Sequence, residues 1–171
     1  MIRHRVLRSC GTRAEADCSP CGAYRYALTL RWGAGPRLAW VMLNPSRADA
    51  ARNDPTVERC ERRARAMGYG AMRVVNLFAV RATRPADMRR AADPVGPEGD
   101  AALDAALRWA DDAICGWGVQ GAHRGRDREV RARIRRPLVL GLTSGGHPRH
   151  PLYVPYAAEP VPWLDAPARA A

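Results

Sequence analysis

Short apolar runs along the chain indicate buried strands. Polar and apolar residues alternate over 24–32, which is typical of a strand with one buried face, whereas 38–43 is continuously apolar, as in a strand buried on both faces. Further apolar runs of this second kind cover 72–78, 112–117 and 137–142. Because only the Gly- and Pro-containing turn 33–36 separates the first two strands, we predict that they form a hairpin.

Helical segments fill the gaps between these strands. Asp54 and Pro55 begin a helix that ends at Gly68, since Asp is a favoured N-cap and Pro suits the first helical position. Further helices are expected over 85–91, 97–110 and 126–135. The alternation predicts an α/β fold, namely a three-layer α/β/α domain. Its central sheet is expected to have four mostly parallel strands plus one N-terminal antiparallel strand.

One domain is predicted over 23–156, between an irregular N-terminal arm (1–22) and a Pro- and Ala-rich tail (157–171). A chain of 171 residues suits a single core. No apolar run approaches the roughly 18 residues of a membrane span. The odd number of cysteines and the lack of an apolar leader favour a reducing compartment. We therefore expect a soluble, cytoplasmic monomer without membrane contacts.

The spacing of two cysteines leaves a metal site open. Cys18 and Cys21 form a C-x-x-C pair, and Cys10 is available as a further ligand. A single pair of this kind is a weak signal, since structural zinc sites use four ligands. We expect no cofactor, and zinc or an iron–sulfur cluster at these cysteines is the alternative.

The charge of the chain is strongly positive and rests entirely on arginine. All 28 basic residues are arginine and the formal net charge is +11. Without lysine there can be no Schiff-base chemistry and no Walker A phosphate loop. We attribute the preference for arginine over lysine to GC-rich coding, so this preference is no evidence for a particular partner. The positive net charge alone favours a nucleic-acid partner.

Polar and aromatic side chains lie at or just after the ends of the buried strands. The residues concerned are Asn44, Ser46, Asn76, Phe78, Trp117, His147, Arg149 and His150. In a parallel sheet these ends meet at one edge, where ligands bind. Carboxamides and imidazoles beside aromatic rings suit a planar ligand with donors and acceptors on its rim, such as a nucleobase. Each of these residues also has a structural alternative.

These structural alternatives differ in weight. Asn44-Pro45 is a common turn dipeptide, Trp117 suits packing as well as stacking, and His150 can simply anchor the tail. Asn76 can cap a neighbouring loop. It is the hardest to dismiss, because a buried carboxamide without partners costs about 1–3 kcal/mol.

The order of these motifs resembles the uracil-DNA glycosylase superfamily. The resemblance rests on Asn44-Pro45 after one strand, Asn76 on the next, Trp117-Gly118, and His147-Pro148 late in the chain. It implies that Asn44 orients the attacking water, Asn76 reads the base edge and His147 stabilises the leaving base. Met42 replaces an expected glycine and the uracil-specific motif is absent, so uracil is not implied as the substrate.

A second resemblance covers more of the chain but implies no activity. Four segments, 24–26, 41–46, 92–97 and 146–153, are similar to a small bacterial and phage domain family of uncharacterised function.

Together these features predict a monofunctional N-glycosidase that acts on a modified or damaged base in DNA or on a nucleoside. Asp49 or Asp54 would assist the water held by Asn44. Base-binding side chains would be Asn76, Phe78 and Trp117, and the nucleic-acid backbone would contact Ser46, Arg149 and His150. Lack of lysine implies hydrolysis without strand cleavage. Two alternatives stay open: a non-catalytic module that binds nucleic acid or a nucleobase, and a small-molecule hydrolase or transferase.

Overall fold

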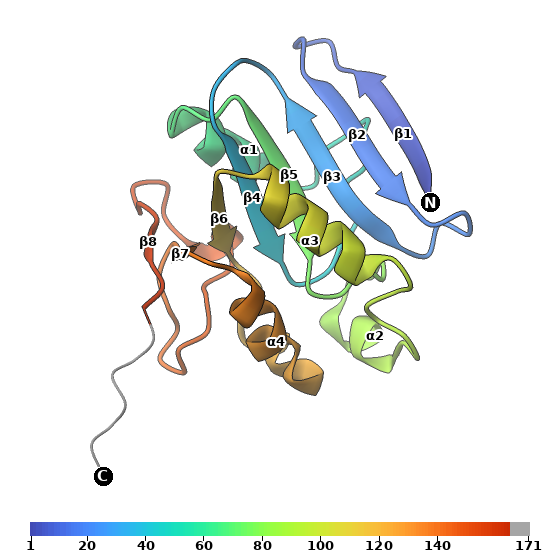
Figure 1. Ribbon diagram of the computed structural model, residues 1–171, viewed down its shortest axis with the longest axis vertical. Helices are drawn as coiled ribbons and strands as arrows, with labels where there is room; N and C mark the ends of the chain where they lie inside the picture. The colour runs from blue at the N-terminus through green and yellow to red at the C-terminus, as the bar shows by residue number, and fades with distance from the viewer. Residues whose placement is uncertain (165–171) are drawn as a thin grey trace.

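An eight-stranded mixed sheet forms the centre of the computed structural model, which describes residues 1–164 (Figure 1). The strands in spatial order are β1 (Ile2–Leu7), β2 (Arg13–Cys18), β3 (Arg25–Arg31), β5 (Ala71–Asn76), β4 (Arg37–Met42), β6 (Asp112–Cys115), β7 (Pro137–Val139) and β8 (Val161–Pro162). The helices are α1 (Pro55–Ala66), α2 (Pro85–Arg90), α3 (Gly99–Trp109) and α4 (Arg126–Arg133), with the 3₁₀ segments η1 (Val119–Gly125) and η2 (Pro151–Tyr153).

The sheet has an antiparallel half and a parallel half. Strands β1, β2 and β3 pair antiparallel with one another, and β3 pairs antiparallel with β5. Strands β5, β4, β6 and β7 pair in parallel, and β8 returns antiparallel to β7. The predicted α/β class is therefore confirmed. The sheet is larger than expected and its pairings are mostly antiparallel, so it differs from the predicted sheet of four mostly parallel strands with one addition.

Both faces of the central strand β4 are covered, which explains its continuous apolar run. Trp40 packs in a cluster with Val57 and Cys60 of α1, whereas Val41 packs in a second cluster with Leu103 of α3. Successive side chains of a strand point to opposite faces, so the strand contributes to both cores. In Figure 1, α3 lies in front of the sheet and α1 behind it. No helix among residues 1–164 is long and apolar enough to cross a membrane.

The predicted hairpin of the strands 24–32 and 38–43 is wrong, because β5 lies between β3 and β4. Backbone hydrogen bonds fix the insertion: Gly33 N donates to Gly70 O, and Gly70 N donates to Pro36 O. A Cβ at Gly70 would lie 2.5 Å from the carbonyl carbon of Ala34. The connection therefore wraps around the start of β5, and only glycine fits there.

The N-terminal arm is not irregular, and this prediction is also wrong. Residues 1–22 contain β1 and β2, which pair over their full lengths. In β2 the buried positions are Ala14, Ala16 and Cys18, with polar residues between them. Small side chains give a weak hydrophobic pattern, which explains the error. The tail also contributes to the domain beyond residue 156, because β8 pairs with β7; positions 165–171 of that predicted tail lie outside the described residues.

Candidate ligand-binding site

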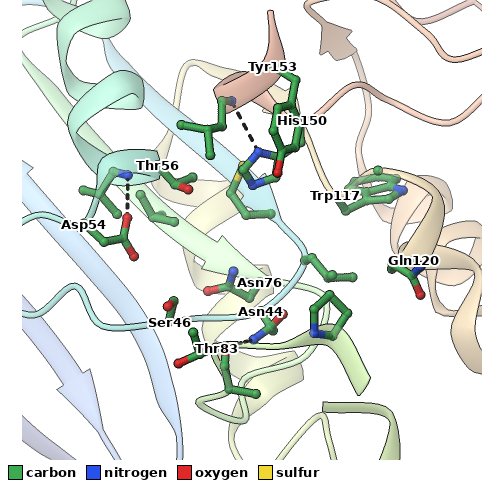
Figure 2. Close-up of a pocket in the computed structure, with 18 of the residues that line it drawn as sticks. Asn44, Ser46, Asp54, Thr56, Asn76, Thr83, Trp117, Gln120, His150 and Tyr153 are labelled. Atoms are coloured by element: carbon green, nitrogen blue, oxygen red, sulfur yellow. Dashed lines mark hydrogen bonds between the residues drawn. The ribbon is translucent and has the colours of Figure 1, made fainter. Parts of the chain in front are cut away.

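A cavity of about 530 Å³ opens at the carboxyl ends of the parallel strands. Its lining comes from the residues that follow β4 and β6, from the end of β5, from the N-terminus of α1 and from η2. Figure 2 shows Asn44 and Asn76 between Asp54 on one side and Trp117 on the other, with His150 nearby. The predicted meeting of strand ends thus produces a real cavity.

Asn44 follows β4 and is held by its amide nitrogen. Its Nδ2 donates to the carbonyl oxygens of Ala82, at 2.7 Å, and Pro45, at 3.1 Å. These bonds tie the loop after β4 to the segment after β5, which is the structural role expected of an Asn-Pro turn. They also fix the amide so that Oδ1 is the atom left to accept a hydrogen bond from a ligand.

Asn76 is the last residue of β5 and is 6% exposed. Its Oδ1 lies 3.5 Å from Nη2 of Arg25, and within residues 1–164 its Nδ2 has no hydrogen-bond partner. Because buried amides are normally paired, this donor is available to a ligand. Asn44 and Asn76 therefore offer the cavity one acceptor and one donor.

Asp54 places a carboxylate at the N-terminus of α1. As the N-cap, its Oδ1 accepts the backbone N–H of Val57 at 2.9 Å, and Pro55 occupies the first helical position. This is the start that the sequence predicts. Asp54 also lines the cavity, so the atom that is not used in capping can contact a ligand or a water molecule.

His150 provides an imidazole in the same cavity. Its Nδ1 accepts the backbone N–H of Leu152 at 3.3 Å, so in the neutral ring Nε2 carries the proton. Burial lowers the pKa of His150, while the Asp54 carboxylate acts in the opposite direction. The neutral form is therefore favoured near pH 7, and it presents a hydrogen-bond donor.

Of the other predicted residues, Ser46, Trp117 and Arg149 line the cavity, but His147, Asp49 and Phe78 do not. His147 Nδ1 lies 3.8 Å from Asp127 Oδ2. Asp49 uses Oδ1 to accept the backbone N–H groups of Ala51 and Arg52. Phe78 is fully buried and packs against His123. Each of the three is thus engaged elsewhere.

The cysteines do not come together as a ligand set. Cys18 is buried in the core, whereas Cys10 and Cys21 are exposed and lie near the hydroxyls of Thr12 and Ser19. Among residues 1–164, no group of three or more His, Cys, Asp or Glu side chains is arranged to hold a metal ion.

The family of the chain follows from a model described as "Protein of unknown function (DUF1643)", which matches residues 25–152. The chain belongs to this family. The predicted likeness to a domain family of uncharacterised function is confirmed in this form. No curated protein and no solved structure matches the chain. Nothing in these comparisons links the DUF1643 family to the uracil-DNA glycosylase superfamily, so that resemblance stays a prediction.

Arg25 is the charged cavity residue that sequence reasoning missed, and it is the first residue of the DUF1643 match. It begins β3, is 2% exposed and donates from Nη1 to the carbonyl oxygen of Ala48 at 2.8 Å. Burial lowers its pKa to about 10. The available signal was a charged residue within a strand whose other positions are mostly apolar.

Proposed function

We propose that the protein is a monofunctional N-glycosidase that hydrolyses the bond between a nucleobase and its sugar. The observation that carries this proposal is that one cavity contains the carboxamides of Asn44 and Asn76, a neutral imidazole and a carboxylate. These are the groups that base recognition and hydrolysis require. The order of motifs along the chain, which resembles that of the uracil-DNA glycosylases, supports the same reading.

Recognition of the base is assigned to Asn44 and Asn76. Oδ1 of Asn44 accepts from a ring N–H or amino group, and Nδ2 of Asn76 donates to a ring nitrogen or carbonyl oxygen. Trp117 forms part of the wall against which a planar ring packs. A cavity of about 530 Å³ has room for a base and its sugar.

The chemical step replaces the glycosidic C–N bond by a C–O bond from water. Asp54 accepts a hydrogen bond from this water and takes its proton as the C–O bond forms. The departing base keeps the bonding electrons, and the Nε2–H of His150 donates a hydrogen bond to its developing negative charge. This assignment keeps Asp54, one of the two aspartates expected to assist the water, and gives His150 the role that the resemblance implied for His147. It also moves Asn44 from positioning the water to binding the base. With no lysine, the products are a free base and an intact sugar backbone.

A polymeric substrate is favoured by the net charge of +11 and by Arg149, which is exposed and lines the cavity. Arginine binds phosphate groups with strong, bidentate hydrogen bonds. Ser46 lies in the same lining and offers a further contact to the backbone.

The test is a panel of oligonucleotides that carry uracil, hypoxanthine, mismatched thymine or alkylated bases, together with the free nucleosides. Alkali after incubation cleaves abasic strands, and chromatography detects free bases. We expect base release from at least one member of the panel. Intact strands and nucleosides throughout would overturn the proposal. Binding without base release would favour the alternative of a non-catalytic module.

A further inference from the structure

Three buried arginines differ in how well their charges are compensated. Arg25, Arg63 and Arg126 are 2%, 4% and 4% exposed. Arg126 forms ion pairs with Asp100 and Glu129, and its Nε donates to the carbonyl oxygen of Leu77. Its charge is thus balanced by carboxylates, as expected for a buried ion.

Among residues 1–164, Arg63 has no carboxylate partner, but carbonyl oxygens surround its guanidinium. Its Nη atoms donate to the backbone oxygens of four residues that follow η2, Val154, Pro155, Tyr156 and Ala158. This guanidinium therefore fastens the chain after η2 to α1. Both of its Nη atoms donate hydrogen bonds, although its Nε, like that of Arg25, has no partner among residues 1–164.

Arg25 is the poorly satisfied member of the three. It has one good hydrogen bond, to Ala48 O, and a contact to Asn76 Oδ1 at 3.5 Å, the outer limit for a hydrogen bond. Its Nε has no partner, and no carboxylate among residues 1–164 lies within ion-pair distance of it. The carboxylate of Asp54 acts on Arg25 only at longer range, and the charge of Arg81 opposes it.

We propose that Arg25 binds an oxyanion of the ligand, so that the cavity takes a molecule with a phosphate or carboxylate group. The guanidinium lines the cavity, and an uncompensated buried charge is costly unless a partner of opposite charge joins it. A planar guanidinium matches the two oxygens of such a group. The identification of this anion as part of a nucleotide or of a carboxylated base rests on the proposed function. The oxyanion site itself does not depend on that function.

The test compares Arg25→Met with Arg63→Met, which remove the same charge from equally buried positions. Melting temperature and binding heat are measured with inorganic phosphate, uridine, uridine 5′-monophosphate and orotic acid at constant ionic strength. The monophosphate and orotic acid arms separate a phosphate ester from a base carboxylate. For wild type we expect stabilisation by anions and at least about tenfold tighter binding of an anionic ligand than of uridine.

The two variants then separate ligand binding from structural support. Arg25→Met is expected to be as stable as wild type or more so without ligand, and to lose the anion-dependent stabilisation. Arg63→Met is expected to melt at a lower temperature than wild type but to keep the anion-dependent stabilisation. Equal stabilisation of wild type and Arg25→Met would overturn the proposal. The proposal would also be overturned if no anion raised the melting temperature of wild type or bound to it. This outcome does not depend on whether either variant folds. Base release without anion dependence would overturn only this inference, and anion binding without base release only the proposed function.

Discussion

The antiparallel and parallel halves of the sheet use polar residues in different ways. In β1 and β2, charged side chains pair at the surface, as Arg3 does with Asp17 and Glu15. In the parallel half, Asn76 is buried at a strand end, and its Nδ2 has no hydrogen-bond partner among residues 1–164. Exposed ion pairs contribute little to stability, whereas buried polar groups without partners are costly. The candidate site therefore lies where polar groups are kept despite that cost, and not where the charges are most numerous.

Strand β3 joins the two halves. Its first residue, Arg25, is the one residue of β1, β2 and β3 that lines the cavity, and β3 pairs with both β2 and β5. The antiparallel half therefore supports the site at one point, through a buried guanidinium.

The largest expected difference is in the cost of removing an isoleucine. Ile114 of β6 is fully buried and Ile2 of β1 is 44% exposed. We expect Ile114→Ala to lower the free energy of unfolding by about 2–5 kcal/mol, because it leaves a cavity in the core. Ile2→Ala should change it by less than about 0.5 kcal/mol. Urea denaturation of the two variants measures both values, and similar losses would contradict the assignment of β1 as a peripheral strand.

Two glycines test the junction between the halves. Gly33 lies in the β3–β4 connection, and Gly70 lies just before β5, which this connection wraps around. Gly70→Ala places a Cβ against the backbone of Ala34, and we expect a loss of about 1–3 kcal/mol in unfolding free energy. Gly33→Ala is the control, since a Cβ there meets nothing within 4 Å. Thermal unfolding measures both. A Gly70→Ala protein as stable as the control would show that the connection does not wrap around β5 as described.

A pH dependence of stability is expected from the parallel half through His150. Since its pKa is lower in the folded protein than its ordinary value of 6.5, the unfolded chain takes up the proton first as pH falls. Stability contributed by His150 is therefore lost below about pH 6.5. Denaturation between pH 5 and pH 8 should show a smaller pH effect for His150→Asn than for wild type. His147→Asn is the control. An equal reduction of the pH effect in that variant would contradict the assignment of this effect to His150.

The smallest expected effect is in the surface ion pairs of the antiparallel half. Arg3 Nε lies 2.5 Å from Asp17 Oδ1, but the arginine side chain is 44% exposed. We expect Asp17→Asn to cost about 0.2–1 kcal/mol and this cost to shrink in high salt. Denaturation at low and high ionic strength measures it. If Asp17→Asn lowered the unfolding free energy by more than Gly70→Ala does, the surface ion pairs would stabilise the fold more than the packing of the connection does.

The accuracy of sequence-based reasoning also differs between the halves. Strands β4 and β5 follow from continuous apolar runs, and the start of α1 follows from Asp54 and Pro55. Strand β2 was missed because its buried positions are small, and the insertion of β5 was missed because strand order depends on long-range pairing. No local pattern along the chain encodes such pairing.

The candidate site was predicted to the level of strand ends but not of side-chain direction. Asn44, Asn76, Trp117 and His150 lie in the cavity as the strand order implies. His147, only three residues from His150, lies outside it. Loop conformation decides between such neighbours, and the positive φ of Gly146 just before His147 is not readable from the sequence alone.

We propose that the cavity at the parallel strand ends performs the hydrolysis, and substitutions of two aspartates provide the sharpest test of this role. Asp54→Asn and Asp49→Asn both keep a side chain that caps or closes a turn, because Asn and Asp are interchangeable there. On the member of the base panel that wild type cleaves, we expect Asp54→Asn to lower kcat by about 10²–10⁴-fold and Asp49→Asn to leave it unchanged. Full activity of Asp54→Asn, or an equal loss in Asp49→Asn, would show that Asp54 does not activate the water.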